Sequence, residues 1–267
     1  MKKFLALILV LSLVFAFAAC AGKQGNDATD PATPDTSADD STEAPAADTD
    51  AKSEGVMTYA EYAAAALDTE VTVETYVQAK QSWWENKATL YTQDKDGAYF
   101  LYNMPCTEEE YAKLVPGTKI KVTGFKSEWS GEIEITDAKF EIEEGSFIAT
   151  AQDVTALLGK EELAEKQNQF VAFKGMTVEA SADADGNEAA FLYSYDGSGE
   201  EGSDLYFKVS KDGQTFTFTV ESYLCGPDTD VYKAVKALNV GDVIDMEGFL
   251  YWYNGANPHI TAVSAAN

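Results

Sequence analysis

The sequence predicts a mostly β protein built from two successive five-stranded barrels. The main observation is a repeat, because residues 114–125, LVPGTKIKVTGF, return at residues 238–249 as LNVGDVIDMEGF. Both copies place a turn glycine before alternating apolar residues, which is the pattern of a half-buried strand. Both also end in glycine followed by phenylalanine, and a glycine within a strand suits the sharp bend that closes a small barrel. One fold used twice is therefore expected.

The elements of the first copy follow one another between residues 58 and 135. Thr58 with Glu61, and Thr107 with Glu110, are spaced as capping boxes, and each pair predicts a short helix. Alternating or β-branched segments predict five strands, at residues 71–77, 88–92, 98–102, 120–125 and 132–135. A helix thus falls between the third and fourth strands, which is the element order of the OB-fold, a five-stranded Greek-key barrel.

The second copy repeats this order after a linker helix expected at residues 153–167. Strands are predicted at residues 170–175 and 190–193, in a hairpin of 205–209 with 216–220, and at 243–246 and 259–263. A helix from Asp228 to Leu238 again precedes the last two strands. The sequence therefore predicts two tandem OB-like barrels, at residues 56–145 and 150–267, each with a helix between strands three and four.

The first twenty residues predict export and lipid attachment. Residues 1–3 include two lysines, residues 4–19 are uncharged and apolar, and Cys20 follows two alanines. This is the order of a signal peptide, and its end resembles a bacterial lipobox, with Phe17 where leucine is usual. Cys20 is expected to carry the acyl chains that hold the protein on the extracytoplasmic face of the cell membrane. A spanning helix is the alternative, since the apolar run is near the shortest that crosses a bilayer.

Composition separates a tether from the folded part and limits the partners. Residues 21–55 contain mainly Asp, Thr, Ala, Pro, Ser and Glu, which cannot offset the chain entropy of folding, so a disordered acidic tether is expected. Four of the 19 basic residues and nine of the 45 acidic residues precede Val56, which leaves 15 against 36 in the folded part. Because nucleic-acid binding depends on Lys and Arg at phosphates, the sequence predicts that nucleic acid is not a partner.

Three segments of the folded part carry a family resemblance: residues 76–84, YVQAKQSWW; residues 91–100, YTQDKDGAYF; and residues 248–253, GFLYWY. They resemble a group of predicted surface lipoproteins from Gram-positive, Clostridia-type bacteria, over essentially the whole folded part. The group has no assigned activity. The resemblance therefore implies location and fold, and it implies no catalytic residues.

Aromatic residues gather where an OB barrel binds its ligand, which is the face of strands two and three beside the loops 1–2 and 4–5. The rings at these loop positions are Trp83, Trp84 and Trp129 in the first copy and Tyr251, Trp252 and Tyr253 in the second. Core packing is the alternative for large rings. Adjacent strand residues point to opposite faces, however, so Trp83 and Trp84 cannot both be buried in one core. An aromatic binding surface is expected, and its acidic surroundings favour neutral or cationic ligands.

No other motif predicts catalysis, a cofactor or a metal site. Residues 183–188, DADGNE, contain part of a calcium loop without its final glutamate, and Asp-Gly is a common hairpin signal, so a turn is expected. His259 is the only histidine, and one histidine does not form a zinc site of the usual kind, so a hydrogen-bonded strand residue is expected. Cys106 and Cys225 each precede a helix. They are expected to be free and buried, with a disulfide as the alternative outside the membrane.

The function expected from these features is a non-enzymatic binding or interaction module at the cell surface, with a glycan, a peptide or an envelope protein as its ligand. The alternative is a small-ligand or cation-binding accessory lipoprotein of a transport system. Solute receptors typically close a hinged two-lobed cleft. Two small tandem barrels lack such a cleft, which favours the first function.

Overall fold

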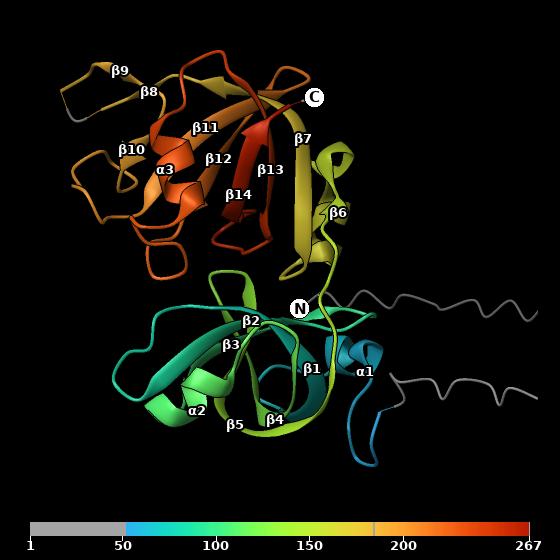
Figure 1. Cartoon of the computed structure of the whole chain (residues 1–267). Helices are drawn as coiled ribbons and strands as arrows, with labels where there is room; N and C mark the ends of the chain where they lie inside the picture. The colour runs from blue at the N-terminus through green and yellow to red at the C-terminus, as the bar shows by residue number, and fades with distance from the viewer. Residues whose placement is uncertain (1–51, 184, 267) are drawn as a thin grey trace, which may run out of the picture. The chain divides into compact units, whose positions relative to one another are not determined.

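The computed structural model describes residues 52–183 and 185–266, drawn in colour in Figure 1. The predicted signal peptide, the lipidation site Cys20 and nearly all of the predicted tether lie outside the described residues. Both barrels belong to one compact unit, Ala47–Asn267. Within the described residues, no helix has the length and apolar character needed to span a membrane.

The first barrel is a closed ring of five strands in the order β1-β2-β3-β5-β4. Its strands are β1 (Glu70–Lys80), β2 (Lys87–Gln93), β3 (Ala98–Pro105), β4 (Thr118–Trp129) and β5 (Glu132–Ser146). Helix α1 (Tyr59–Ala64) precedes the ring and helix α2 (Glu108–Lys113) lies between β3 and β4. Both helices begin with the predicted capping boxes. The Thr58 and Thr107 side chains each accept the backbone N–H of the glutamate three residues on, and the side chain of that glutamate accepts the backbone N–H of the threonine.

The second barrel has the same ring, in the order β11-β12-β14-β13-β7, and a pairing of β11 with β7 closes it. Its strands are β7 (Phe170–Glu179), β11 (Leu205–Lys211), β12 (Gln214–Val220), β13 (Val243–Phe249) and β14 (His259–Ala265). Helix α3 (Asp230–Lys236) lies between β12 and β13. The predicted fold class is therefore confirmed: two tandem OB-like barrels, each with a helix between its third and fourth strands.

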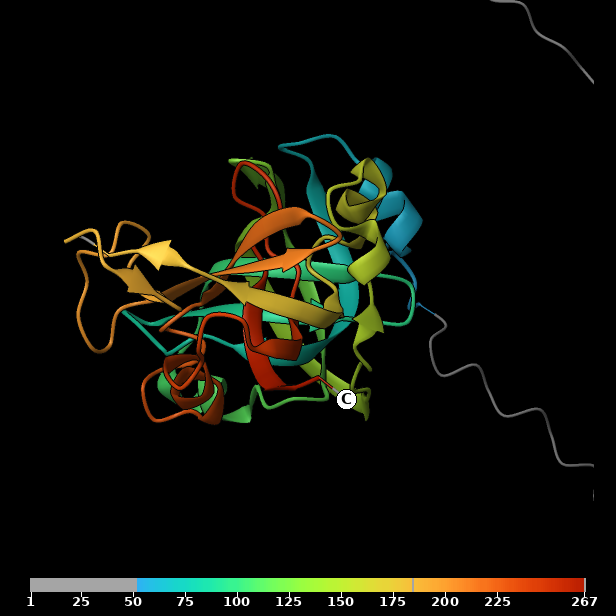
Figure 2. The same cartoon turned by 90° about the horizontal axis from the view of Figure 1, so that it is seen from above.

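Short strands extend the second barrel outside its ring. Strand β6 (Gln152–Asp153) pairs with β7, β10 (Leu192–Tyr193) pairs with β11, and β8 (Ser181–Ala182) forms a hairpin with β9 (Glu188–Ala189). This hairpin points away from the ring strands in Figures 1 and 2. The prediction of a barrel strand at residues 190–193 is wrong, because only the two residues of β10 are extended and they pair at the outer edge of β11.

The linker between the barrels also differs from the prediction of one helix at residues 153–167. It forms two short 3-10 helices, η1 (Thr155–Leu157) and η2 (Glu161–Lys166), after β6. Gly159, with a φ of 74°, separates them, and this left-handed conformation interrupts a helical path. The bonds from Leu158 N to Thr155 O and from Gln167 N to Ala164 O are the i→i+3 bonds of 3-10 geometry.

The repeated glycines, Gly124 and Gly248, lie where the last two strands of each ring bend. The register of the strand pair shifts beside each of them, which marks a bulge. A Cβ on Gly124 would lie 2.8 Å from the carbonyl oxygen of Thr136, and one on Gly248 would overlap the carbonyl oxygen of His259. Glycine is required at both positions because the neighbouring backbone lies that close.

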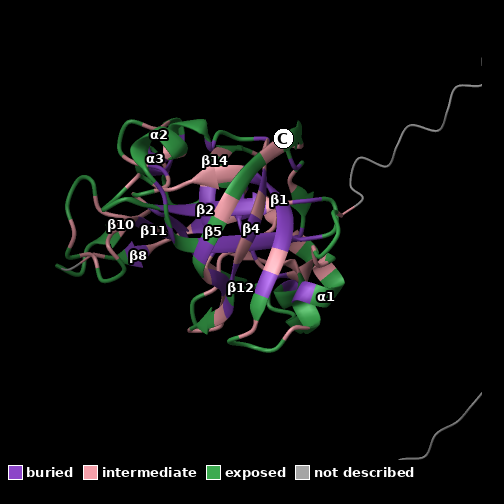
Figure 3. Ribbon diagram, turned by 90° about the horizontal axis from the view of Figure 1, so that it is seen from below, coloured by how far each residue is buried: buried purple, intermediate pink, exposed green. Residues whose placement is uncertain are grey.

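Each barrel has its own core, and a third cluster joins them. Buried residues concentrate on the barrel strands, whereas α1 and α2 are largely exposed (Figure 3). The joining cluster centres on three buried rings, Tyr91, Phe100 and Phe249. Tyr91 stacks on Phe249 with centroids 4.5 Å apart, and Phe170 N–H donates to Oε1 of Gln93 at 2.7 Å. The barrels therefore meet through a packed contact of rings.

Candidate aromatic binding groove

A groove of about 810 Å³ lies on the second barrel and is the candidate site. It is lined by Trp129, Tyr195, Asp204, Tyr206, Thr217, Thr219, Glu221, Tyr251, Tyr253, Ala256, Asn257 and His259. These residues come from β11, β12 and the start of β14, from the β10–β11, β12–α3 and β13–β14 loops, and from the end of β4 in the first barrel. Strands β11 and β12 are strands two and three of this ring, so the groove occupies the usual ligand face of an OB barrel. We call it the aromatic groove.

Trp129 and Tyr253 form the wall where the two barrels meet. Trp129 is the last residue of β4, and Tyr253 lies in the β13–β14 loop. Asn254 N–H donates to the carbonyl of Ser130 at 2.7 Å, which ties the two loops together. The two ring centroids are 5.2 Å apart, yet Trp129 is 54% and Tyr253 is 49% exposed. Each ring therefore keeps about half of its surface available to a ligand.

His259, a buried residue of the groove lining, contacts two tyrosines. Tyr251 stacks on His259 with centroids 4.4 Å apart. Nδ1 of His259 shares a hydrogen bond of 2.8 Å with the hydroxyl of Tyr91 in the first barrel. Burial lowers the pKa of His259 to about 3, so the imidazole is neutral at physiological pH. The expectation of a hydrogen-bonded strand residue is confirmed, and His259 positions Tyr251.

Two carboxylates lie beside the rings. Oδ1 of Asp204 accepts bonds from the backbone N and the Oγ of Ser222, at 2.8 and 2.7 Å. Glu221 accepts the backbone N–H groups of Tyr223 and Leu224 at 3.2 and 2.8 Å. Burial, and then the charge of Asp204, raise the pKa of Glu221 to about 7. The groove lining contains no lysine, so these two acids give it a negative character.

The structure brings together three of the six predicted ring residues, Trp129, Tyr251 and Tyr253. Trp83 is half-buried and donates its indole N–H to the carbonyl of Cys106 at 2.9 Å. Trp84 is 67% exposed, in the β1–β2 loop, but it does not line the groove.

Trp252 also lies outside the aromatic groove. Its ring packs against the core of the second barrel, and a Cβ on Gly131 would lie 2.8 Å from it. This is the fate expected of a large ring that fills a core. Of the six rings predicted to share one binding surface, three lie together in the aromatic groove and three lie outside it.

Eight lining residues of the groove were not singled out from the sequence: Tyr195, Asp204, Tyr206, Thr217, Thr219, Glu221, Ala256 and Asn257. Tyr206 could have been found from the alternation of residues along its strand. It stands between Leu205 and Phe207, which are buried, so its side chain faces outward on β11. Asp204 and Glu221 could not be singled out from the sequence, because 45 acidic residues are spread through the chain. Tyr195, 77% exposed, lies in a loop without periodicity.

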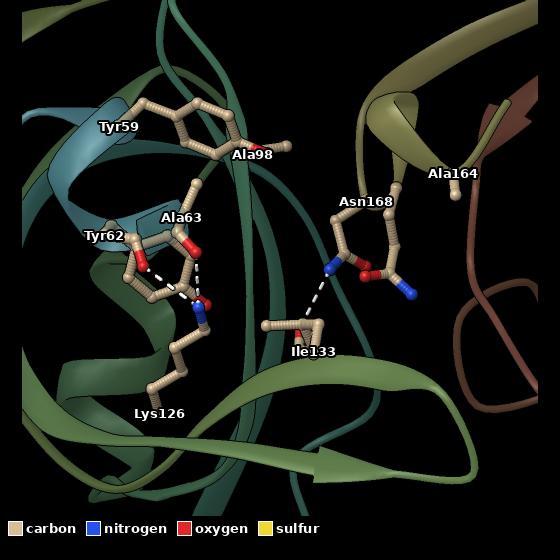
Figure 4. Close-up of a pocket in the computed structure, with 9 residues that line it drawn as sticks. Tyr59, Tyr62, Ala63, Ala98, Lys126, Ile133, Ala164 and Asn168 are labelled. Carbon is tan, nitrogen blue, oxygen red and sulfur yellow. Dashed lines mark hydrogen bonds between the residues drawn. The ribbon is translucent and has the colours of Figure 1, made fainter. Parts of the chain in front are cut away.

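A smaller cavity of about 120 Å³ lies beside α1 (Figure 4). Lys126 extends into it and donates to the carbonyls of Tyr62, Ala63 and Ala65 at 3.0, 2.9 and 2.8 Å. These carbonyls are at the end of α1, where backbone donors become scarce and a lysine is favoured; the Tyr62 carbonyl also accepts the N–H of Ala65 at 3.2 Å. The Nζ of Lys126 therefore caps the C-terminal end of α1 by hydrogen bonding to its carbonyls.

Asn168 lines the same cavity and contacts the fully buried Glu132. Its Nδ2 donates to the carbonyl of Ile133 at 3.0 Å (Figure 4). Oε2 of Glu132 accepts the backbone N–H of Trp252 at 2.8 Å. Oε1 of Glu132 and Oδ1 of Asn168 have no hydrogen-bond partner within the described part of the chain. Burial raises the pKa of Glu132 to about 8. A protonated Glu132 can donate to Asn168 and satisfy both oxygens.

The remaining candidate sites are structural. Asp183 Oδ1 accepts the N–H groups of Asp185 and Asn187 at 3.0 and 2.8 Å, which confirms the turn expected in place of a calcium loop. Across residues 52–183 and 185–266, no group of three or more His, Cys, Asp or Glu side chains could hold a metal ion. Cys106 and Cys225 are free and buried, as expected. Burial raises the pKa of both thiols to about 11.

Comparison with known proteins finds no matching family model and no matching curated protein. Among solved structures, a murine DNA-binding protein bound to double-stranded DNA is similar, with 13% identity, a TM-score of 0.33, and coverage of 73% of this chain and 96% of that one. The Ifi202 HINa domain in complex with 20-base-pair double-stranded DNA has 10% identity, a TM-score of 0.33, and coverage of 75% and 97%. At such TM-scores, neither structure identifies a ligand for this chain.

The comparisons correct one expectation from the sequence. Nucleic acid was excluded as a partner because the folded part is acidic. Structures similar to this chain include domains bound to double-stranded DNA, so the exclusion is wrong. It assumed that the net charge of the whole folded part decides the partner, whereas a binding face covers only a small area of the surface.

Proposed function

We propose that this protein is a lipid-anchored, extracytoplasmic binding module and that the aromatic groove is its ligand site. The observation that carries the proposal is the groove itself: about 810 Å³ on the face of strands two and three of the second barrel, with three rings more than 45% exposed. This volume is within the range of natural ligand pockets, which is about 300–1,000 Å³. Exposed rings gathered on one face mark interaction sites, whereas scattered ones are ordinary.

The proposed function is non-enzymatic because the groups in and near the groove are poorly suited to nucleophilic chemistry. The imidazole of His259 is 6% exposed and its Nδ1 is already bonded to Tyr91. The thiol of Cys225 is buried, and burial raises its pKa to about 11, whereas an effective nucleophile needs a lowered pKa or an adjacent base. The rings and hydrogen-bonding groups of the groove support recognition better than reaction.

The proposed ligand is a glycan, a peptide or an envelope protein. Faces of Trp and Tyr pack against sugar rings and apolar side-chain stems, while their edges and polar tips accept or donate hydrogen bonds. Threonine and asparagine in the lining, Thr217, Thr219 and Asn257, add hydrogen-bonding groups on the β12 side. A short stretch of a polymer that presents both apolar faces and polar groups fits this lining.

The proposal is tested by screening the purified protein against glycan and peptide arrays, with double-stranded DNA in the same panel. Trp129→Ala and Tyr253→Ala each remove one half-exposed ring, and we expect each to lower the affinity for the bound probe by roughly tenfold or more. Trp84→Ala is the matched control, because it removes an even more exposed ring outside the groove. Equal losses in all three variants, or a loss in Trp84→Ala alone, would show that the groove is not the site.

A further inference from the structure

The aromatic groove combines exposed ring faces with negative charge. The ring centroids of Trp129 and Tyr253 lie 5.2 Å apart, and Asp204, Tyr206 and Glu221 belong to the same lining. The two cation–ring contacts found in the described residues lie elsewhere, with Lys80 over Tyr111 and Lys126 over Tyr62. The ring faces of the groove are therefore available to a cation from outside the chain.

The two acids of the groove lack a basic neighbour in its lining. In the described part of the chain, Asp204 and Glu221 accept hydrogen bonds from neutral groups alone, the backbone and the hydroxyl of Ser222. Glu221 is 8% exposed, and the charge of Asp204 contributes to the raised pKa of its carboxyl. A positive charge brought near the pair would offset both the desolvation and the repulsion.

We propose that the aromatic groove binds a lysine side chain of an extended peptide, with the stem packed against Trp129 and Tyr253 and the ammonium group directed at Asp204 and Glu221. This inference rests on the proposed function and names the ligand class. A lysine combines an apolar stem of four carbons with a point charge, which matches a lining that combines exposed rings with two carboxylates.

The local charge of the groove favours this occupant over a second copy of the chain. The lining contains Asp204 and Glu221 and no lysine, so it attracts a basic peptide, whereas the same lining of a second copy would bring like charges together. Thr217 and Asn257 lie along the same groove and offer hydrogen-bonding groups to a peptide backbone. Thr219 Oγ1 already donates to Oδ1 of Asn257 at 2.8 Å, which leaves the Asn257 amide nitrogen as a donor.

The test is calorimetric titration of the purified protein with hexalysine at physiological ionic strength. The matched probe is hexalysine acetylated on every side chain, which keeps the stem and removes the charge. The variant is the pair Asp204→Asn with Glu221→Gln. Asparagine can keep both bonds from Ser222 on its single oxygen, whereas glutamine keeps one of the two backbone bonds that the Glu221 carboxylate accepts, so denaturant unfolding of the variant is measured alongside to show that it is folded. The control pair is Asp185→Asn with Glu188→Gln, which removes two exposed acids at the β8–β9 hairpin outside the groove.

We expect hexalysine to bind and acetylation to weaken binding by roughly tenfold or more. The groove pair should weaken it by a similar factor, and the control pair should change the Kd less than about twofold, as a screened surface charge does. No binding of hexalysine, equal losses in the two pairs, or equally tight binding of spermidine would overturn the inference. If an array ligand without an amine still loses affinity in Trp129→Ala, the proposed function stands and only its lysine specificity fails.

Discussion

Replacing Glu132 by glutamine is predicted to make the protein more stable at alkaline pH. Glu132 is fully buried, and the neutral acid can donate to Asn168 while Oε2 accepts the N–H of Trp252. Glutamine has the same shape, keeps an acceptor for Trp252 and presents an NH₂ donor toward Asn168. The variant thus retains the packing of the neutral acid and removes its ionisation.

The magnitude follows from the pKa. Burial raises the pKa of Glu132 from 4.5 to about 8, a difference of about 3.5 pH units, and each unit corresponds to about 1.4 kcal/mol. The unfolded chain releases the proton near pH 4.5 and the folded chain keeps it until about pH 8, so the unfolded state binds fewer protons between these values. Stability therefore falls as pH rises through this window. The full cost above pH 8 is on the order of 5 kcal/mol.

The assay is denaturant unfolding of wild type and Glu132→Gln at pH 5, 7 and 9. We expect nearly equal free energies of unfolding at pH 5 and an advantage of a few kcal/mol for the variant at pH 9. Glu128→Gln is the control, because Glu128 is exposed on the same β4–β5 hairpin, and it should leave the pH dependence unchanged. The reasoning is refuted if Glu132→Gln keeps the wild-type pH dependence or is less stable than wild type at pH 9.

Three further predictions concern the anchor, the rings and α1. Cys20→Ala should abolish incorporation of a labelled fatty acid, and equal labelling of variant and wild type would refute lipidation. Trp252→Ala should lower the free energy of unfolding by on the order of 3 kcal/mol, because the ring packs on the second core. Trp84→Ala should change it by less than about 0.5 kcal/mol, and equal effects in denaturant unfolding would contradict these assignments. Lys126→Met should cost roughly 2 kcal/mol, because the carbonyls of Ala63 and Ala65 at the end of α1 lose their donor and that of Tyr62 keeps only the N–H of Ala65. An unchanged melting temperature would exclude that role.

Local signals in the sequence predicted most of the fold. The repeated glycine–phenylalanine pairs placed the bend of each barrel, and the capping boxes at Thr58 and Thr107 placed two helices, because these features depend on nearby residues. The linker at residues 153–167 was predicted as one helix, but Gly159 adopts a left-handed conformation and only 3-10 turns form.

The site could be predicted only in part. Trp129, Tyr251 and Tyr253 were found because OB barrels bind beside the loop 4–5. The sequence did not indicate that a ring from the first barrel would join a groove on the second, since this depends on the packing of Tyr91 against Phe249. That contact joins residues far apart in the chain and has no local signature.

Ligand binding in the aromatic groove is tested most directly by an NMR titration of the protein with its tryptophan indoles labelled with ¹⁵N. The chain has four tryptophans, so each indole signal can be assigned from a Trp→Phe variant. With the strongest binder from the arrays, the Trp129 signal should shift in a saturable manner, while those of Trp83, Trp84 and Trp252 should stay near their free positions. A saturable shift of Trp84 with Trp129 unmoved would place the ligand on the first barrel and contradict the account.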